Sequence, residues 1–129
     1  HPVEDLEPVA SVEELLEAQE EIKRIFVSPA VKEYIVRLVH ATRQHSDIYL
    51  GASPRGSLTL YRTSQARAAM LGRDYVLPDD VKFVAPYVLT HRLIVSPSAR
   101  LRNVTPSDVL VEVLEQLPVP EPSREQVVR

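Results

Sequence analysis

Cysteine and tryptophan are absent from this chain of 129 residues, and glycine occurs only three times. Without cysteine, the protein can form neither a disulfide framework nor a thiolate metal site. Three glycines are too few for an all-β protein, which needs many tight turns. No apolar run approaches the ~20 residues that cross a bilayer, so a membrane is not expected as a partner. Aromatic residues make up only 5% of the chain, so aliphatic side chains must form the core.

Basic residues are also outnumbered. Fifteen Lys and Arg against eighteen Asp and Glu give a formal net charge of −3. Nucleic-acid-binding domains usually gain affinity from a basic surface that displaces counterions. The acidic balance therefore argues against nucleic acid as a partner and weakens the alternative of a helix-turn-helix DNA reader.

The motifs of phosphoryl transfer are missing as well. The glycines are Gly51, Gly56 and Gly72, and none belongs to a GxxxxGK[ST] phosphate-binding loop. No strand ends in adjacent acids that could hold magnesium, so this chain cannot hydrolyse a nucleotide alone. His40 and His45 lie about 140° apart around a helix, on different faces, and no metal site is predicted.

Prolines are plentiful, and their positions predict helix starts. Ser28–Pro29, Ser53–Pro54 and Thr105–Pro106 each place a hydroxyl at the N-cap and a proline at the first helical position. Ser11, with Glu14 three residues later, predicts a capping box. Each pattern predicts a helix that begins at a defined residue.

These starts predict an all-α fold, a small bundle of about five to six helices with at most a minor short β element. The expected helices cover residues 12–26, 29–45, 54–71 and 106–117, with a short helix from 78 that ends at Pro86 and another over 87–92. Gly72 is expected to cap the third helix, and 93–95 to form a short strand. The residues expected to face the core are Val12, Leu15, Leu16, Ile22, Ile25 and Phe26 in the first helix, Val31, Ile35, Leu38 and Val39 in the second, and Leu58, Tyr61, Ala68 and Leu71 in the third.

One segment combines a sharp turn, a helix start and a cation. Gly51 allows the turn, Ser53 and Pro54 begin the helix, and Arg55 follows in its first turn. A cation beside the positive end of a helix dipole is unfavourable unless an anion is near. Guanidinium and free N–H groups together could bind a phosphate. The alternative is that Arg55 pairs with a local acid or faces solvent.

At this segment the chain resembles the C-terminal lid of MoxR-type AAA+ ATPases. The resemblance extends over residues 11–117 and is densest between 50 and 94. The motifs that carry it, in order, are Gly51-Ala52-Ser53-Pro54-Arg55, Arg67-Ala68, Gly72-Arg73-Asp74-Tyr75-Val76, Pro78-Asp79-Asp80-Val81-Lys82, Ala85-Pro86, Val88-Leu89 and His91-Arg92-Leu93.

The resemblance implies a lid that packs beside an α/β nucleotide-binding domain and closes over ATP. Arg55 matches the family's sensor-two arginine, which contacts the γ-phosphate, so Arg55 is the expected catalytic residue. Ser53 and Pro54, with Arg55, are the expected cofactor-binding residues. ATP and Mg²⁺ are the expected cofactors of the complete protein, with none bound by this chain alone.

The same resemblance implies the wider organisation. Residues 1–10 are expected to link a preceding ATPase core to a lid at 11–117, followed by a flexible proline-rich tail at 118–129. The implied partners are the protein's own core, neighbouring subunits of a hexameric ring and a von Willebrand A-domain protein, in a chaperone-like or metal-cofactor-insertion role in the cytoplasm. The alternative function is a stand-alone helical protein-interaction module, with the first or last helix docking the partner.

Overall fold

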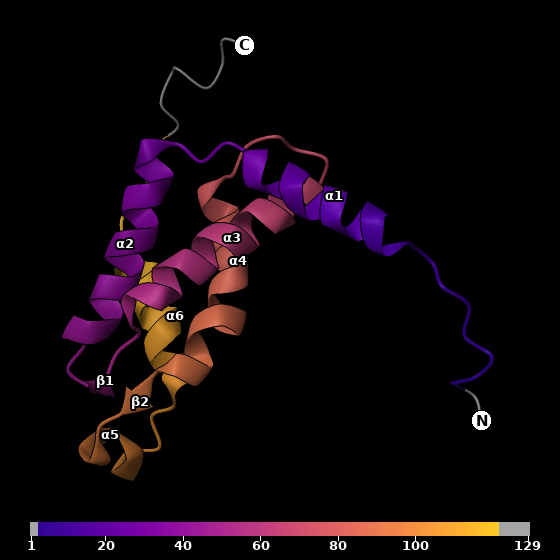
Figure 1. The fold of residues 1–129 in the computed structure, drawn as a ribbon. Coiled ribbons are helices and arrows are strands. Elements are labelled where there is room, and N and C mark those ends of the chain that lie inside the picture. Colours follow the sequence, from indigo (N-terminus) through magenta and orange to yellow (C-terminus); the bar gives the residue numbers. More distant parts are fainter. Residues whose placement is uncertain (1–2, 122–129) are drawn as a thin grey trace.

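The computed structural model describes residues 3–121 and consists mainly of helices (Figure 1). A bundle contains α2 (Pro29–Gln44), α3 (Pro54–Met70), α4 (Pro78–Leu89) and α6 (Pro106–Gln116), while α1 (Val12–Arg24) projects from it. A 3₁₀ turn, η1 (Thr90–Arg92), follows α4 directly. The predicted all-α class is confirmed.

A minor β element closes one end of the bundle. β1 (Ile48–Leu50) pairs antiparallel with β2 (Ile94–Val95), and the short helix α5 (Pro97–Leu101) follows. The strand expected at 93–95 is therefore confirmed, whereas β1 and α5 were not predicted. Ser96–Pro97 carries the same helix-start pattern as the predicted starts, and the Ser96 hydroxyl accepts from the Ala99 N–H at 3.3 Å.

The core is aliphatic, as expected. Leu38 of α2, Leu60 of α3, Leu89 of α4 and Leu110 of α6 are all at most 1% exposed. The face predicted for the second helix is confirmed, because its four residues are all buried. These side chains hold the four helices as one body around a common core.

Two other predicted faces are wrong. In α3, Ala68 is buried, but Leu58 and Leu71 are exposed and Tyr61 is only partly buried; Leu60 takes the core position instead. The inward face of α3 also carries buried polar side chains, which obscures its apolar periodicity. No residue of α1 itself is buried, and Val12, Leu15 and Leu16 of the expected stripe are exposed. Of that stripe only Ile25, at the end of the helix, packs against the core, and it is partly buried.

Most helix boundaries follow the local chemistry. Ser11, Ser28 and Thr105 cap their helices as predicted. Pro86 was expected to end a helix, yet α4 continues through it to Leu89. Pro86 is exposed, so the carbonyl that loses its partner one turn earlier can turn toward water, which lessens the cost of an internal proline.

The tail predicted at 118–129 lies largely outside the described residues. Residues 118–120 form no helix, and Val119 and Pro120 line a shallow pocket with residues of α2. Within residues 3–121, no helix has the length and apolar character needed to cross a membrane.

Candidate functional site

The loop before α3 passes very close to α2. A Cβ atom on Gly51 would lie 2.5 Å from Arg43 Cγ and 2.7 Å from Arg43 Cα, so only glycine fits there. One turn into α3, a Cβ on Gly56 would lie 3.2 Å from Leu89 Cδ2 of α4. The start of α3 is therefore in close contact with both neighbouring helices.

The N-terminus of α3 has no side-chain cap. Ser53 occupies the predicted N-cap position with extended backbone, but its hydroxyl accepts from no first-turn N–H, so the expected cap hydrogen bond is the part of that prediction that is wrong. A capping Ser53 hydroxyl would accept a hydrogen bond from the Gly56 N–H. That N–H instead donates to the Ser53 carbonyl oxygen at 2.8 Å. The first turn also contains no acid. Its positive dipole end is consequently left uncompensated by the helix's own side chains.

Arg55 is the second residue of this helix, and its side chain is exposed. Within residues 3–121 it makes no side-chain hydrogen bond or ion pair, so the alternative of a local acidic partner is not seen and the guanidinium faces solvent. Ser53 and Pro54 are exposed beside it. A guanidinium next to an uncapped helix start can receive an oxyanion such as a phosphate.

The opposite end of α3 is tightly fixed. Gly72 has the left-handed φ of 71° that was predicted, and the N–H groups of Gly72 and Arg73 donate to the carbonyls of Ala69 and Ala68, each at 2.9 Å. This is a Schellman motif, which satisfies the free carbonyls of the last turn. It also directs Arg73 back toward the start of α4.

Arg73 meets a buried carboxylate. Asp80 is 2% exposed and accepts from Arg73 Nη1 at 2.8 Å and Nη2 at 2.6 Å, and from the Leu77 N–H at 2.8 Å. Arg67 Nε lies 3.3 Å from the same carboxylate, and its guanidinium lies 3.4 Å from the ring centroid of Phe83. We call Arg67, Arg73, Asp80 and Phe83 the Asp80 cluster.

Electrostatics in this cluster favour the charged carboxylate. Burial raises the pKa of Asp80, but the hydrogen bonds from Arg73 and Leu77 and the charges of Arg73 and Arg67 outweigh burial and hold that pKa below its usual range. From the sequence, Asp80 was identified as part of the Pro78-Asp79-Asp80-Val81-Lys82 motif, and this role was not predicted. The cluster joins the end of α3 to the start of α4, which points to a structural rather than a catalytic function.

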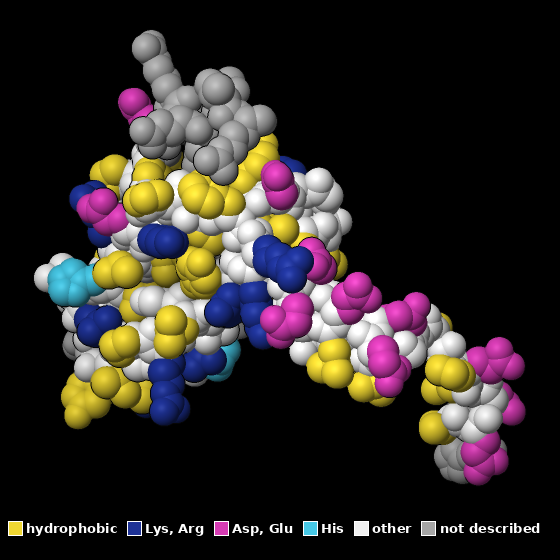
Figure 2. Space-filling model, turned by 45° about the horizontal axis from the view of Figure 1, so that its top comes forward, with side chains coloured by type: hydrophobic (Ala, Val, Ile, Leu, Met, Phe, Trp, Pro, Cys, Tyr) yellow, Lys and Arg dark blue, Asp and Glu magenta, His cyan; other side chains and the backbone are white. Residues whose placement is uncertain are grey.

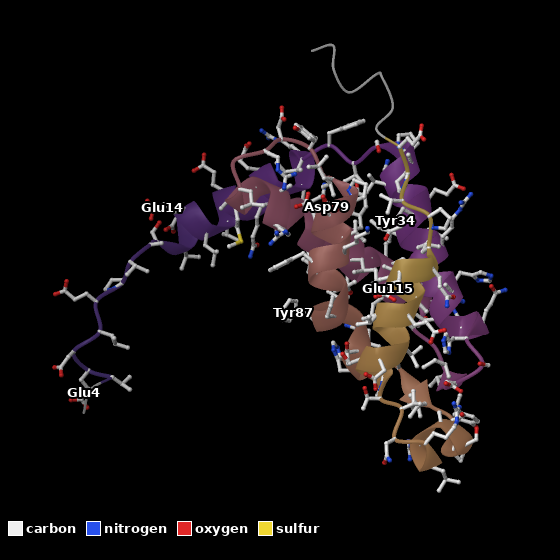
Figure 3. All side chains as sticks on the ribbon, turned by 180° about the vertical axis from the view of Figure 1, so that it is seen from behind. Glu4, Glu14, Tyr34, Asp79, Tyr87 and Glu115 are labelled. Carbon is white, nitrogen blue, oxygen red and sulfur yellow. The ribbon has the colours of Figure 1, made fainter. Side chains whose placement is uncertain are left out.

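Tyr34 is a second buried polar residue whose environment was not predicted from the sequence. Its hydroxyl has no hydrogen-bond partner within residues 3–121. Burial, and then the charge of Asp79, raise the pKa of Tyr34 above its ordinary value. Figure 3 shows Tyr34 on α2 and Asp79 at the start of α4, at the same end of the bundle. A phenol that stays protonated in this way cannot act as a base near neutral pH.

Comparison with known proteins identifies the domain. The family model for the AAA lid domain matches residues 40–113. Protein YeaC of Bacillus subtilis (strain 168) is 40% identical over 120 residues, which cover 93% of this chain and 38% of that protein. Chaperone MoxR1 of Mycobacterium tuberculosis is 37% identical over 122 residues, covering 88% of this chain and 32% of that protein.

A solved structure agrees with these relatives. A putative ATPase from Cytophaga hutchinsonii superposes with a TM-score of 0.81 at 32% identity, over 84% of this chain and 36% of that one. The chain thus spans about a third of the length of the proteins it matches. The chain belongs to the AAA lid domain family and is a lid of the MoxR type.

Proposed function

We propose that this lid closes over ATP held by a separate core domain, and that Arg55 is the sensor-two arginine that contacts the γ-phosphate. The observation that carries the proposal is an exposed arginine, without a side-chain partner in the described part of the chain, in the first turn of an uncapped helix. No hydrogen bond or ion pair within residues 3–121 offsets the cost of placing a cation at the positive end of the helix dipole. A phosphate bound by another domain would offset that cost.

The residues at this helix start suit a phosphate and not a metal ion. Arg55 offers a planar set of N–H donors, and the helix dipole adds to its attraction for an anion. No acid lies in the first turn of α3, so Mg²⁺ would be held by the core domain and by the phosphates themselves. In this arrangement the lid binds and orients the terminal phosphate while the core supplies the remaining ligands.

The proposed mechanism couples this contact to lid movement. Hydrogen bonds to charged groups contribute about 1.5–3 kcal/mol each, enough to bias a two-state hinge. ATP would draw Arg55 toward the junction, and hydrolysis would remove the contact and release the lid. We place this movement in a ring of subunits with a chaperone-like or metal-cofactor-insertion role in the cytoplasm, with a von Willebrand A-domain protein as partner.

The test is Arg55→Ala in the complete ATPase. Loss of one such contact should lower kcat about 10- to 100-fold. The lid's melting temperature should change little, because the exposed Arg55 side chain makes no hydrogen bond or ion pair within residues 3–121. Arg100→Ala is a matched control: Arg100 is also exposed and, within residues 3–121, also lacks a side-chain partner, but it lies in the last turn of α5. Normal turnover by the Arg55 variant would reject the assignment.

A second candidate function is protein docking through α1, and one observation favours it. Val12, Leu15 and Leu16 are 55–68% exposed along one side of a helix that projects from the bundle. Figure 2 shows hydrophobic side chains on one side of the projecting segment and acidic side chains on the other. An amphipathic helix of this kind usually buries its apolar side against a neighbour.

The core domain or a neighbouring ring subunit is the partner we propose for α1. Leu16→Asp should weaken binding of this chain to a separately expressed core domain by at least tenfold, because a charge would enter the contact. Glu17→Gln on the acidic side is the control and should bind as wild type does. Equal binding by both variants would exclude α1 from the contact.

A further inference from the structure

We infer that Thr42 is a positioning residue for Arg55, an inference that rests on the proposed function of Arg55. Thr42 lies near the end of α2 and is completely buried. Its hydroxyl donates to the Val39 carbonyl oxygen at 2.7 Å and accepts from the Ala52 N–H at 3.2 Å. Ala52 is ten residues further along the chain and only three before Arg55. One buried hydroxyl thus links α2 to the segment that carries the arginine.

The geometry of the hydroxyl explains why it can fix this segment. Thr42 makes a hydrogen bond to its own helix, as threonines in helices often do, and that bond orients its free lone pairs. Ala52 is itself completely buried, so its N–H has no access to water. Without Thr42 the N–H would be left without an acceptor, and the loop would have to move to satisfy it.

Packing on both sides of Ala52 leaves the segment little freedom to adjust. Gly51 lies against Arg43 of α2, and Gly56 lies against Leu89 of α4, as the Cβ distances show. A Cβ on Gly56 would also lie 3.4 Å from the Cβ of Ala52. The hydrogen bond to Thr42 therefore lies between two close packing contacts and sets the register of residues 51–56 on α2.

Arg55 depends on this anchor because α3 does not fix its own start. The helices α1, α2, α5 and α6 each have a hydroxyl that accepts from a first-turn N–H, whereas Ser53 makes no such bond. The polar contact that fixes this segment lies one residue before the N-cap, between the Ala52 N–H and the Thr42 hydroxyl, and it leaves the first-turn N–H groups of α3 uncapped by any side chain. The uncapped turn stays open to a phosphate while its position remains fixed.

The experiment is a double-mutant cycle in the complete ATPase with ATP as the substrate. Thr42→Val keeps the shape of the side chain but removes the hydroxyl, and should lower kcat about tenfold, since small misplacement of a contacting group is costly. Thr42→Ser keeps the hydroxyl and should retain kcat within about twofold of wild type. In an Arg55→Ala background, Thr42→Val should have no further effect on kcat.

Thr63→Val is the matched control. Thr63 is a partly buried threonine of α3 whose hydroxyl donates to the carbonyls of Thr59 and Leu60 but joins no second element. Its replacement should leave kcat within about twofold. All rates are compared well below each variant's melting temperature, so that a general loss of stability does not enter kcat.

The possible failures are distinguishable. Normal turnover by Arg55→Ala would reject the proposed function itself. A slow Arg55→Ala enzyme combined with normal Thr42→Val turnover, or an equal Thr42→Val effect with and without Arg55, would overturn the positioning role alone. If Thr42→Val does not fold, hydrogen exchange of the Ala52 amide in the wild-type chain tests whether the Thr42 hydroxyl holds that N–H. We expect the Ala52 amide to be protected as strongly as the core amides. Exchange at the rate of an open loop would overturn the proposed role of Thr42.

Discussion

Replacing Asp80 with asparagine removes the charge that joins α3 to α4. The carboxylate accepts three hydrogen bonds, two from Arg73 and one from the Leu77 N–H, and lies 3.3 Å from Arg67 Nε. Asparagine is nearly isosteric, but it has one acceptor oxygen and turns an N–H₂ group toward the guanidinium groups. The substitution therefore tests the Asp80 cluster with little change in packing.

The expected loss follows from burial. Breaking a buried ion pair by removing one partner costs about 3–5 kcal/mol. The side chains of Arg73 and Arg67 are 21% and 29% exposed, so water can partly solvate them once the carboxylate is gone. We therefore expect a loss of about 2–4 kcal/mol at pH 7, roughly 6–16 °C in melting temperature for a domain of this size.

The loss should also depend on pH. Asp80 has a lowered pKa in the folded state, so it stabilises the fold above the ordinary pKa of about 3.9 and stops doing so as the pH falls through the folded value. The difference in stability between wild type and Asp80→Asn should accordingly shrink below about pH 4. Urea unfolding followed by circular dichroism at several pH values measures both quantities.

Asp79→Asn is the control for this prediction. Asp79 is exposed in the same first turn of α4 and contributes through the helix dipole, so its loss should stay near 0.5 kcal/mol. If Asp80→Asn were no more destabilising than Asp79→Asn, or if its effect were the same at pH 3 and pH 7, the cluster would not hold α3 to α4 as argued.

Three further substitutions test the geometry elsewhere. Gly51→Ala should destabilise the chain by about 1–3 kcal/mol, because the new methyl group meets the backbone of Arg43, as thermal unfolding would show. Gly72→Ala meets no atom within 4 Å and should cost only the left-handed backbone penalty of about 1–2 kcal/mol, so a larger loss in the same assay would contradict the open geometry. Gln65→Leu removes the donor to the Ile25 carbonyl at 2.7 Å and should speed hydrogen exchange in α1 more than in α4; equal changes would mean that Gln65 does not hold α1.

Local chemistry made most helix starts predictable. Ser28, Ser11 and Thr105 each accept from the N–H group three residues further along, so short sequence patterns contain the whole interaction. The left-handed position at Gly72 is equally local. The uncapped start at Ser53 broke the same rule, because its helix is positioned by Thr42, which lies eleven residues earlier in a different helix.

The faces of α1 and α3 could not be predicted for two different reasons. Gln65 and Ser64 of α3 are buried, so hydrophobic periodicity alone selects the wrong side of that helix. Gln65 uses its polarity to bind the last carbonyls of α1, a contact across 40 residues of sequence. The apolar stripe of α1 was correctly recognised as amphipathic, but within residues 3–121 Val12, Leu15 and Leu16 stay exposed and only Ile25, at the end of the stripe, packs against the core. Periodicity predicts that a face is apolar without predicting which neighbour covers it.

The sequence predicted the position of Arg55 on its helix but not the contacts that hold that helix in place. Arg55 lies exposed in the first turn of α3, the position that the sequence predicted. The role of Arg55 toward a phosphate stays a prediction. The residues that hold the site in place were missed. Thr42 has no motif of its own, and Arg73 and Asp80 depend on the Schellman motif at Gly72 to bring them together.

The two ends of α3 differ in a way that bears on lid movement. At its start the helix leaves the Arg55 guanidinium without a partner among residues 3–121, while Gly56 lies against α4 and Ala52 is bound to α2. At its end the Asp80 cluster joins it to α4. A pull on Arg55 therefore acts on a helix that cannot shift alone without breaking buried contacts at both ends. If a phosphate supplies that pull, α2, α3 and α4 must move with it as one body, and the hinge must lie outside this group of helices.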